Sequence, residues 1–531
     1  MKTSKQRRGI GFTNFRRFEN FPLLNFSPIT YMVGKNNSGK STMVKALLLV
    51  LDYLQYQLSD TFSFESNVLE DVNIVTFGRA KNNANSNPTI SYQFHLDEFH
   101  FHIEINGNEE STEASVLVLK IEDSASGVTI EINHLKGEVI VSRTTIEDQV
   151  KKTGGFPLVA QLEKAVDSLK EDLDSEKDKK SAKAFRLQSD YQKALDKLKD
   201  AKKIKNVVKS SVSNNYKVSY SLSAIFGEEN QNDDNPLAYI FERLLFLNEI
   251  NSKKSAKEIG NLANVVALNR STSHLNDCVD RIIAAIENEQ YFYIAANPTK
   301  QSALFYLRDK KNALAQAIHK FYQLGITTQN SENEELRFVQ NWMRSFDVGY
   351  DLDIKFVAGE AYRVNIYETE ANKKKGISSH LADKGMGSLQ VMTLILRIAS
   401  IIREKKKLNR KNKVFTILIE EPELNLHPSL QSQLTVFFHE VFSKYGFNFL
   451  VETHSEYIIR KSQLLGLQQE YFSKDELNIN PFRIFYFHKE IGPYEMKFNS
   501  QGKFDKDFGK GFYDEAAGMT MNIINEIRKR Q

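Results

Sequence analysis

The sequence has almost no cysteine and no long apolar run, and each absence excludes a class of protein. Its single cysteine, Cys278, excludes a disulfide framework and a metal site built from cysteines. No stretch reaches the roughly 18 uninterrupted apolar residues of a membrane-spanning helix, and the basic N-terminus lacks the apolar segment of a signal peptide. We therefore expect a cytoplasmic protein that does not cross a membrane.

Net charge is also small. The chain of 531 residues carries 71 Lys and Arg against 67 Asp and Glu, a formal charge of +4. This balance neither requires nor excludes a nucleic-acid partner, because only a local basic patch would indicate one. Basic clusters at 2–8, 373–375 and 404–413 keep DNA binding open as a hypothesis, although such runs are usually solvated surface.

Glycine and proline are absent between Leu158 and Phe226. Apolar or small residues recur there in alternating steps of three and four, which is the heptad pattern of a coiled coil. The charged stretch 174–181 interrupts the pattern, so we predict an antiparallel coiled-coil hairpin over 151–210. The alternative is two ordinary amphipathic helices folded against the body.

In the rest of the chain, segments whose apolar residues repeat as in strands alternate with segments whose apolar residues repeat as in helices. Five segments within 89–141 alternate apolar and polar residues and predict an antiparallel meander. We interpret 14–18 and 27–34 as strands, 281–295 as a helix and 372–376 as a turn-like basic loop. Four units follow: an N-terminal lobe (1–150), the hairpin (151–210), a mostly helical insertion (211–345), and a C-terminal lobe (346–531) that alternates helix and strand as parallel sheets do.

A phosphate-binding loop is the clearest motif. GKNNSGKS at 34–41 satisfies G-x-x-x-x-G-K-[ST] and lies between an apolar strand and a helical segment. In such a loop the backbone N–H groups surround phosphate oxygens, Lys40 reaches the β- and γ-phosphates, and Ser41 offers its hydroxyl to Mg²⁺. The predicted nucleotide contacts are Gly34, Lys35, Asn36, Asn37, Ser38, Gly39, Lys40, Ser41 and Thr42.

Three later segments could complete this site. The apolar strand in VFTILIEEPELNLHP ends in Glu420, a candidate for the metal, and Glu421, a candidate to orient and deprotonate water. FNFLVETHS brings Thr453 and His454 to the carboxyl end of another strand, where the histidine could hydrogen-bond the γ-phosphate. The alternatives are that Glu420 and Glu421 only begin an acidic loop after a core strand, and that His454 is an ordinary surface histidine. GMGSLQ (385–390) precedes a long apolar helix, which we expect to be buried.

Together these four pieces resemble the ABC-type ATPase heads of the SMC/RecF/OLD group. The opening NFRRF, GKNNSGKST, EEPELNLHP and ETHSE look like its OLD-type bacterial branch, and the ending GFYDEAAGM is similar to that of such stand-alone ATPases. The resemblance covers 1–80 and 380–460 well and says little about 150–345. It implies an α/β P-loop head, with a parallel core sheet, an antiparallel β-subdomain and a helical or coiled-coil insertion.

The resemblance also implies residue roles. Glu420 stands in the Walker B metal position, where many relatives carry Asp, Glu421 is the catalytic glutamate, and His454 is the switch histidine. A signature-like loop contacts ATP bound to the opposite subunit, through Gly385, Gly387, Ser388 and Gln390. The sequence departs from the usual pattern, since it lacks an LSGGQ motif and a clear Q-loop glutamine.

The resemblance implies a homodimer, or a higher oligomer, in which ATP and Mg²⁺ are held between two heads. Stand-alone ATPases of this kind resemble the sensor subunits of bacterial antiphage systems such as Septu and PARIS, which control a separate nuclease or toxin effector. The rival hypothesis is a RecF/SMC-like ATPase that acts directly on DNA in repair. A transporter subunit is a third, against which the long insertion and missing LSGGQ count.

Two further activities are weaker hypotheses. A built-in nuclease would need metal-binding acids after a strand, but Asp505 and Asp507 lie in a polar stretch that predicts a loop. His100, His102 and Glu104 share one strand face and could hold a metal, with His95 nearby, but a solvated strand face is the commoner arrangement.

Overall fold

The computed structural model describes the chain over the following residues: 8–57, 59–65, 74–143, 216–221, 262–296, 302–326, 333–407, 413–472, 480–509 and 515–530, with a few short pieces between 166 and 195 and residue 512. Almost all of the predicted coiled-coil hairpin at 151–210 lies outside the described residues. The division into four units stays a prediction.

A six-stranded sheet forms the centre of the head, and five of its strands run parallel. Both faces are covered, which requires strands that are apolar throughout rather than alternating. In spatial order the strands are β11 (Glu289–Ile294), β16 (Val414–Glu420), β17 (Phe447–Thr453), β3 (Ile29–Gly34), β18 (Phe482–His488) and the antiparallel β19 (Gly492–Met496).

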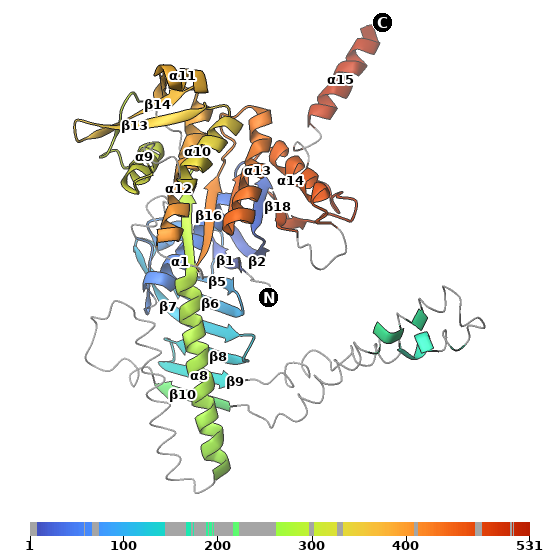
Figure 1. Ribbon diagram of the computed structural model, residues 1–531. Helices are drawn as coiled ribbons and strands as arrows, with labels where there is room; N and C mark the ends of the chain where they lie inside the picture. The colour runs from blue at the N-terminus through green and yellow to red at the C-terminus, as the bar shows by residue number, and fades with distance from the viewer. Residues whose placement is uncertain are drawn as a thin grey trace.

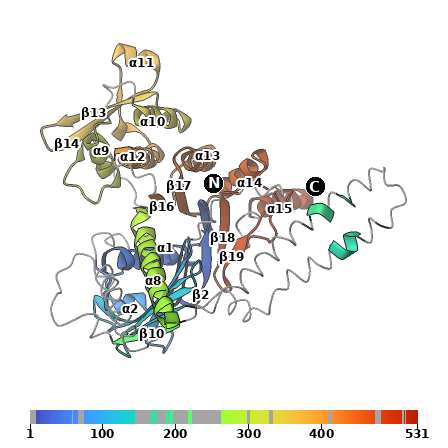
Figure 2. The same ribbon diagram turned by 60° about the horizontal axis from the view of Figure 1, so that its bottom comes forward.

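A nine-stranded antiparallel sheet forms the second layer (Figures 1 and 2). The predicted meander at 89–141 is confirmed as five consecutive strands within it. The strands are β1 (Arg8–Phe15), β2 (Phe18–Phe26), β4 (Thr61–Ser63), β5 (Thr89–Leu96), β6 (Phe99–Asn106), β7 (Glu113–Asp123), β8 (Val128–Asn133), β9 (Glu138–Arg143) and β10 (Tyr216–Ser221).

Helix α1 (Lys40–Asp52) is packed between the two sheets and continues as a π-helical turn over Tyr53–Gln57. Successive side chains of a central strand point to opposite faces of the sheet, so the same strand contributes to the hydrophobic core on each side. Met32 packs with α1 and the antiparallel sheet, whereas its neighbours Tyr31 and Val33 pack with helices on the other face. The antiparallel layer is also covered by α8 (Leu262–Asn288), and the short α2 (Phe77–Ala80) belongs to the same core.

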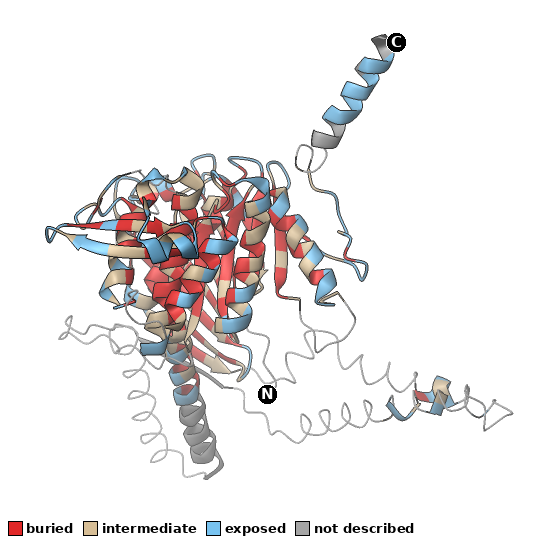
Figure 3. Ribbon diagram, turned by 45° about the horizontal axis from the view of Figure 1, so that its top comes forward, coloured by how far each residue is buried: buried red, intermediate tan, exposed pale blue. Residues whose placement is uncertain are grey.

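The helices of the opposite face belong mostly to the C-terminal part of the chain. They are α9 (Ala313–Gln323), α10 (Glu334–Ser345), α12 (Met386–Lys407), α13 (Pro428–Tyr445) and α14 (Glu456–Gln468). Helix α12 is long and apolar enough to cross a membrane, but 67% of its apolar window is buried in the body, as expected for the predicted core helix. Figure 3 shows this buried centre between exposed outer helix faces.

A small sheet and a projecting helix complete the described chain. The sheet contains β12 (Phe305–Tyr306), β13 (Asp351–Val357), β14 (Ala361–Tyr367) and β15 (Ser379–His380), and it lies beside α11 (Glu370–Lys375) and a 3₁₀ turn (Leu381–Asp383). Helix α15 (Glu515–Arg530) extends away from the body (Figure 1). Asp505 and Asp507 lie outside strands, as predicted.

Three sequence interpretations are wrong in detail. Residues 289–294, expected to continue a helix, form strand β11 at the edge of the central sheet. The segment 14–18 is not one strand, because β1 ends at Phe15 and the chain turns before β2 begins at Phe18. The basic loop at 372–376 is the short helix α11 with Gly376 as its C-cap.

Candidate active site

The phosphate-loop motif lies where its sequence predicts, between β3 and α1. Strand β3 ends at Gly34, and Gly39 caps α1 with φ 103°, a left-handed value that favours glycine. The loop is also tightly enclosed. A Cβ on Gly39 would lie 2.3 Å from Phe18, and one on Gly34 would lie 2.6 Å from the carbonyl oxygen of Phe487. Backbone conformation therefore favours glycine at both positions, since Gly34 has φ 155°, and at Gly34 the nearby backbone oxygen also leaves no space for a side chain.

Lys40 is buried inside the loop that it would serve. Its Nζ donates to the carbonyl oxygens of Gly34 and Lys35 at 3.1 Å each, and Nζ lies 3.7 Å from a carboxylate oxygen of Glu452. Burial lowers the pKa of Lys40, although Glu452 and Glu421 act in the opposite direction. The ammonium group is therefore held at the loop, where it could also contact the phosphates of a bound nucleotide.

A basic cavity of about 620 Å³ opens over the loop and the start of α1. Arg16 and Arg17, in the turn between β1 and β2, contribute to its wall. Arg17 donates to the carbonyl oxygen of Asn37 and, at 2.9 Å, to that of Lys489, so the turn is fixed onto the loop. The other lining cations are Lys45, Arg79 and Lys81. Size and charge both suit a polyphosphate ligand.

The acidic pair after β16 reaches the same region. Glu421 has φ 44°, an unusual conformation for a glutamate, and its N–H donates to the carbonyl oxygen of Glu452 at 2.8 Å. Such strain is commonly retained at functional positions. Glu420 is the last residue of β16, and its Oε1 is buried without a hydrogen-bond partner among the described residues. The Glu420 carboxylate thus has one oxygen that no described residue uses.

Glu452 is a site residue that the sequence analysis did not single out. It lies near the end of β17, where Ser41 Oγ donates to its two carboxylate oxygens at 2.8 and 3.0 Å. The pKa of Glu452 is raised to about 7, chiefly by burial; the Lys40 charge and the Ser41 hydrogen bond lower it, and the charges of Glu420 and Glu421 raise it by smaller amounts. The available signal was an acid directly before Thr453 and His454 at the end of an apolar strand.

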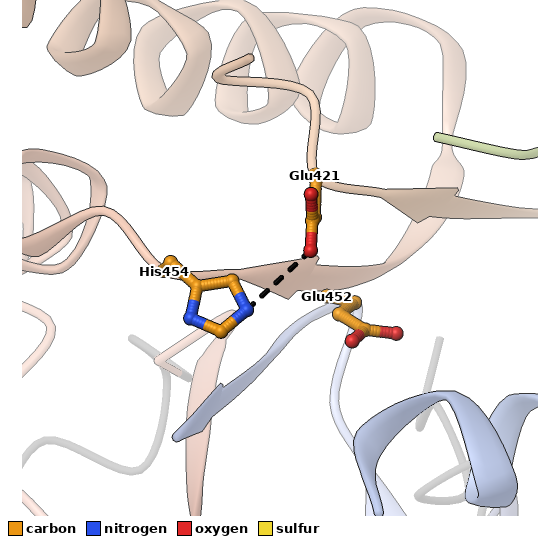
Figure 4. Close-up of side chains that lie close together, drawn as sticks. All are labelled: Glu421, Glu452 and His454. Carbon is orange, nitrogen blue, oxygen red and sulfur yellow. Dashed lines mark ion pairs between the residues drawn. The ribbon is translucent and has the colours of Figure 1, made fainter. Parts of the chain in front are cut away.

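His454 lies beside both acids after β17 (Figure 4). Its Nε2 is 3.4 Å from Glu421 Oε1, and its backbone N–H donates to Glu423 Oε1 at 2.6 Å. Burial, with a smaller effect of the Lys40 charge, lowers the pKa of His454 to about 4. The imidazole is therefore neutral at pH 7 and keeps one N–H and one free nitrogen for hydrogen bonds.

This shift predicts acid sensitivity. The pKa of His454 falls from 6.5 to about 4 on folding, so the unfolded chain binds more protons between these values and stability is lost as pH falls through that window. After discounting for partial exposure, we expect the unfolding free energy of His454→Gln to rise relative to the unsubstituted protein by about 1–2 kcal/mol between pH 7.5 and 4.5.

Urea unfolding across this pH range, with the exposed His380→Gln as control, measures the difference. A difference for His454→Gln that does not change with pH would contradict the assigned shift.

The predicted signature-like residues lie elsewhere, at the start of α12. A Cβ on Gly387 would lie 2.5 Å from the carbonyl oxygen of Asn425, so this turn packs closely against the loop that follows the acidic pair. Gly385 faces open space, and Gln390 is buried beside Ile419 and Pro422. Their predicted contact, with Ser388, to ATP on a second subunit stays a prediction.

The donor set of the loop region fits Mg²⁺, which prefers a hydroxyl and carboxylates and needs few of them. Among the described residues, Glu421, Glu452 and His454 form a group whose ligand atoms lie within 4.8 Å of one another. The histidines of the meander are arranged differently. His102 pairs with Glu104 at 2.9 Å, and His100 lies 3.9 Å from Glu122, so each has a carboxylate neighbour of its own.

A family model described as an AAA ATPase domain matches residues 9–459 of the chain. The chain belongs to this AAA ATPase family. The match spans both the phosphate loop and the segments that carry Glu421 and His454, so it supports an ATPase that uses a bound nucleotide. A comparison with curated proteins finds no match.

Solved structures of Smc heads superpose loosely on the chain. One is an Smc head domain with an extended coiled coil bound to the C-terminal domain of ScpA, from Pyrococcus furiosus, with 11% identity, a TM-score of 0.38 and coverage of 98% of this chain and 99% of that one. Another, an Smc head domain with a coiled coil and joint from Pyrococcus yayanosii, has 9% identity, a TM-score of 0.32 and coverage of 94% and 98%.

Proposed function

We propose that this AAA ATPase hydrolyses ATP with Mg²⁺ and works as a nucleotide-gated homodimer. The observation that carries the proposal is the convergence of segments distant in sequence. Ser41 contacts Glu452, and Glu421 contacts both Glu452 and His454, so three chain segments meet at one phosphate loop. The basic cavity above them has room and charge for a triphosphate.

Each residue has a chemical role in this proposal. Backbone N–H groups of Gly34–Thr42 and the Lys40 ammonium bind the phosphates, and the start of α1 adds its positive end. Ser41 and Glu420 are candidates to hold Mg²⁺, which would neutralise phosphate charge. Glu421 is placed to orient and deprotonate the attacking water, and neutral His454, at 3.4 Å, holds that carboxylate in position.

The proposed biological role is the sensor subunit of an antiphage defence system that controls a separate nuclease or toxin. Support comes from the resemblance to stand-alone ATPases and from the loop at Gly385–Ser388, which begins a helix against the loop that follows the acidic pair and could meet nucleotide on a second head. Binding energy of ATP across two heads would then set the dimer population, and hydrolysis would reset it.

Direct action on DNA receives less support from the described surface. Lys373 and Lys374 pair with Asp351 and Glu370, and Lys406 pairs with Glu334 and Glu335. Each of these lysines thus has an acidic partner within the chain. The basic residues at 2–7 and 408–412 lie outside the described part of the chain. Whether the protein binds DNA is therefore tested by experiment below.

The test measures mass by light scattering with and without ATP and Mg²⁺, together with phosphate release. We expect slow hydrolysis and a shift from monomer to dimer that is reversed as ATP is consumed. An ATP-independent mass would contradict nucleotide gating, and absent hydrolysis would contradict the enzyme assignment.

The effector proposal is tested separately, by co-purification with the products of neighbouring genes. We expect a nuclease or toxin whose binding depends on the nucleotide. A recombination operon, together with DNA binding that weakens steeply with salt, would favour the repair alternative.

A further inference from the structure

We propose that Glu452 is the principal carboxylate on the Mg²⁺ side of the site, acting with Ser41. This inference rests on the proposed ATPase function and revises its sequence-based assignment of Glu420. Among the described contacts, Glu452 is the carboxylate bonded to the loop hydroxyl, through both of its oxygens at 2.8 and 3.0 Å. Glu452 is only 5% exposed, and both it and Ser41 line the basic cavity.

Sheet topology explains why Glu452 rather than Glu420 is adjacent to the loop. Strand β17 lies between β3, which leads into the loop, and β16, which carries Glu420. In the register, Glu452 is opposite Met32 of β3 on one side and opposite Glu420 on the other. Glu420 therefore stands one strand further from the loop than Glu452 does.

Glu452 lies where carboxylates converge at the edge of the basic cavity, close enough together to bind one divalent cation. One buried ammonium, that of Lys40, lies 3.7 Å from Glu452 and is shared with two loop carbonyl oxygens. Glu421 lies within the same metal-compatible group, and Glu420 has a buried oxygen without a hydrogen-bond partner among the described residues. Lys45, in the wall of the basic cavity, also interacts with Glu420 and Glu452. Carboxylates held this close repel one another, and a bound metal ion is a usual compensation.

A purely structural role is the competing explanation, in which Glu452 only holds Ser41 and Lys40 in place. The substitution Glu452→Gln separates the two roles. Glutamine keeps an oxygen that can accept the Ser41 hydrogen bond, but it removes the charge that a cation needs. A structural role would change nucleotide affinity equally with and without Mg²⁺, whereas a metal role would change only the Mg²⁺-dependent part.

The experiment titrates Mg²⁺ against a fluorescent, non-hydrolysable ATP analogue and repeats the binding in EDTA. We expect Glu452→Gln to raise the Mg²⁺ concentration for half-maximal effect by about 10- to 100-fold and to leave binding in EDTA unchanged or tighter. Glu420→Gln should have a smaller effect. Electron paramagnetic resonance of bound Mn²⁺ gives a second readout, in which Glu452→Gln should lose the nucleotide-dependent signal.

The matched control is Glu456→Gln, four residues along, where the carboxylate pairs with Arg460 at 3.8 Å. A Mg²⁺ response that survives in Glu452→Gln and disappears in Glu420→Gln would overturn the inference while leaving the ATPase proposal intact. Failure of the unsubstituted protein to bind the analogue would overturn both, so the two failures are distinguishable.

Discussion

Replacing Glu421 by glutamine should reduce ATP hydrolysis by about 10²- to 10⁴-fold while ATP binding is retained, because this is the usual contribution of a positioned general base. Glutamine has nearly the same size as glutamate, so the strained backbone at φ 44° and its N–H bond to the Glu452 carbonyl oxygen can persist. What is lost is the carboxylate that lies 3.4 Å from His454 and that could take a proton from water.

The measurement combines steady-state phosphate release with light scattering in excess ATP. We expect Glu421→Gln to accumulate as an ATP-bound dimer that disassembles only when nucleotide is removed. The control is Glu440→Gln, on the exposed face of α13, which should turn over ATP normally. Normal turnover in Glu421→Gln would assign the base to another residue.

Replacing Lys40 by alanine should abolish hydrolysis and weaken ATP binding by about 100-fold or more, because truncating the protein partner of a buried charge pair with a ligand costs about 2–5 kcal/mol of binding free energy. Lys40 supplies the buried cation of the loop interior, where it bonds the carbonyl oxygens of Gly34 and Lys35. Without it, Glu452 stays near Glu421 with no ammonium beside it, so the site becomes more repulsive to a triphosphate.

Equilibrium binding of the fluorescent analogue measures this loss, and a thermal melt establishes that Lys40→Ala still folds. Lys136→Ala, in the exposed turn between β8 and β9, is the charge-matched control and should bind normally. Retained affinity in Lys40→Ala would mean that the phosphates are not held in this loop.

Secondary structure could be predicted where the apolar residues repeat with a clear helix or strand period and polar or turn-forming residues bound the segment. The limits of β5 and β16 follow from alternating or apolar segments bounded by polar residues. Strand β11 was missed because it continues directly from α8 with no glycine or proline between them. Its apolar residues suit a helix as well as a buried strand, and only pairing with β16 selects the strand.

The site was predictable only where a local motif fixes the chemistry. Lys40 and Ser41 follow from loop spacing, and Glu421 and His454 follow from polar residues at the ends of apolar strands. The role of Glu452 could not be inferred from a local motif in this way. Its importance depends on which strand lies beside β3, and strand order is decided by long-range pairing and packing.

The sequence by itself therefore determined a phosphate loop, the acids and histidine able to serve it, and an α/β head able to bury both faces of a parallel sheet. The tertiary structure alone decided that β17 separates β3 from β16, which sets Glu452 against Ser41 and leaves Glu420 one strand away. The physical reason is that the chemistry of a side chain depends on its residue type and close neighbours in the sequence. The distances between side chains from distant segments depend on how those segments pack together in the core.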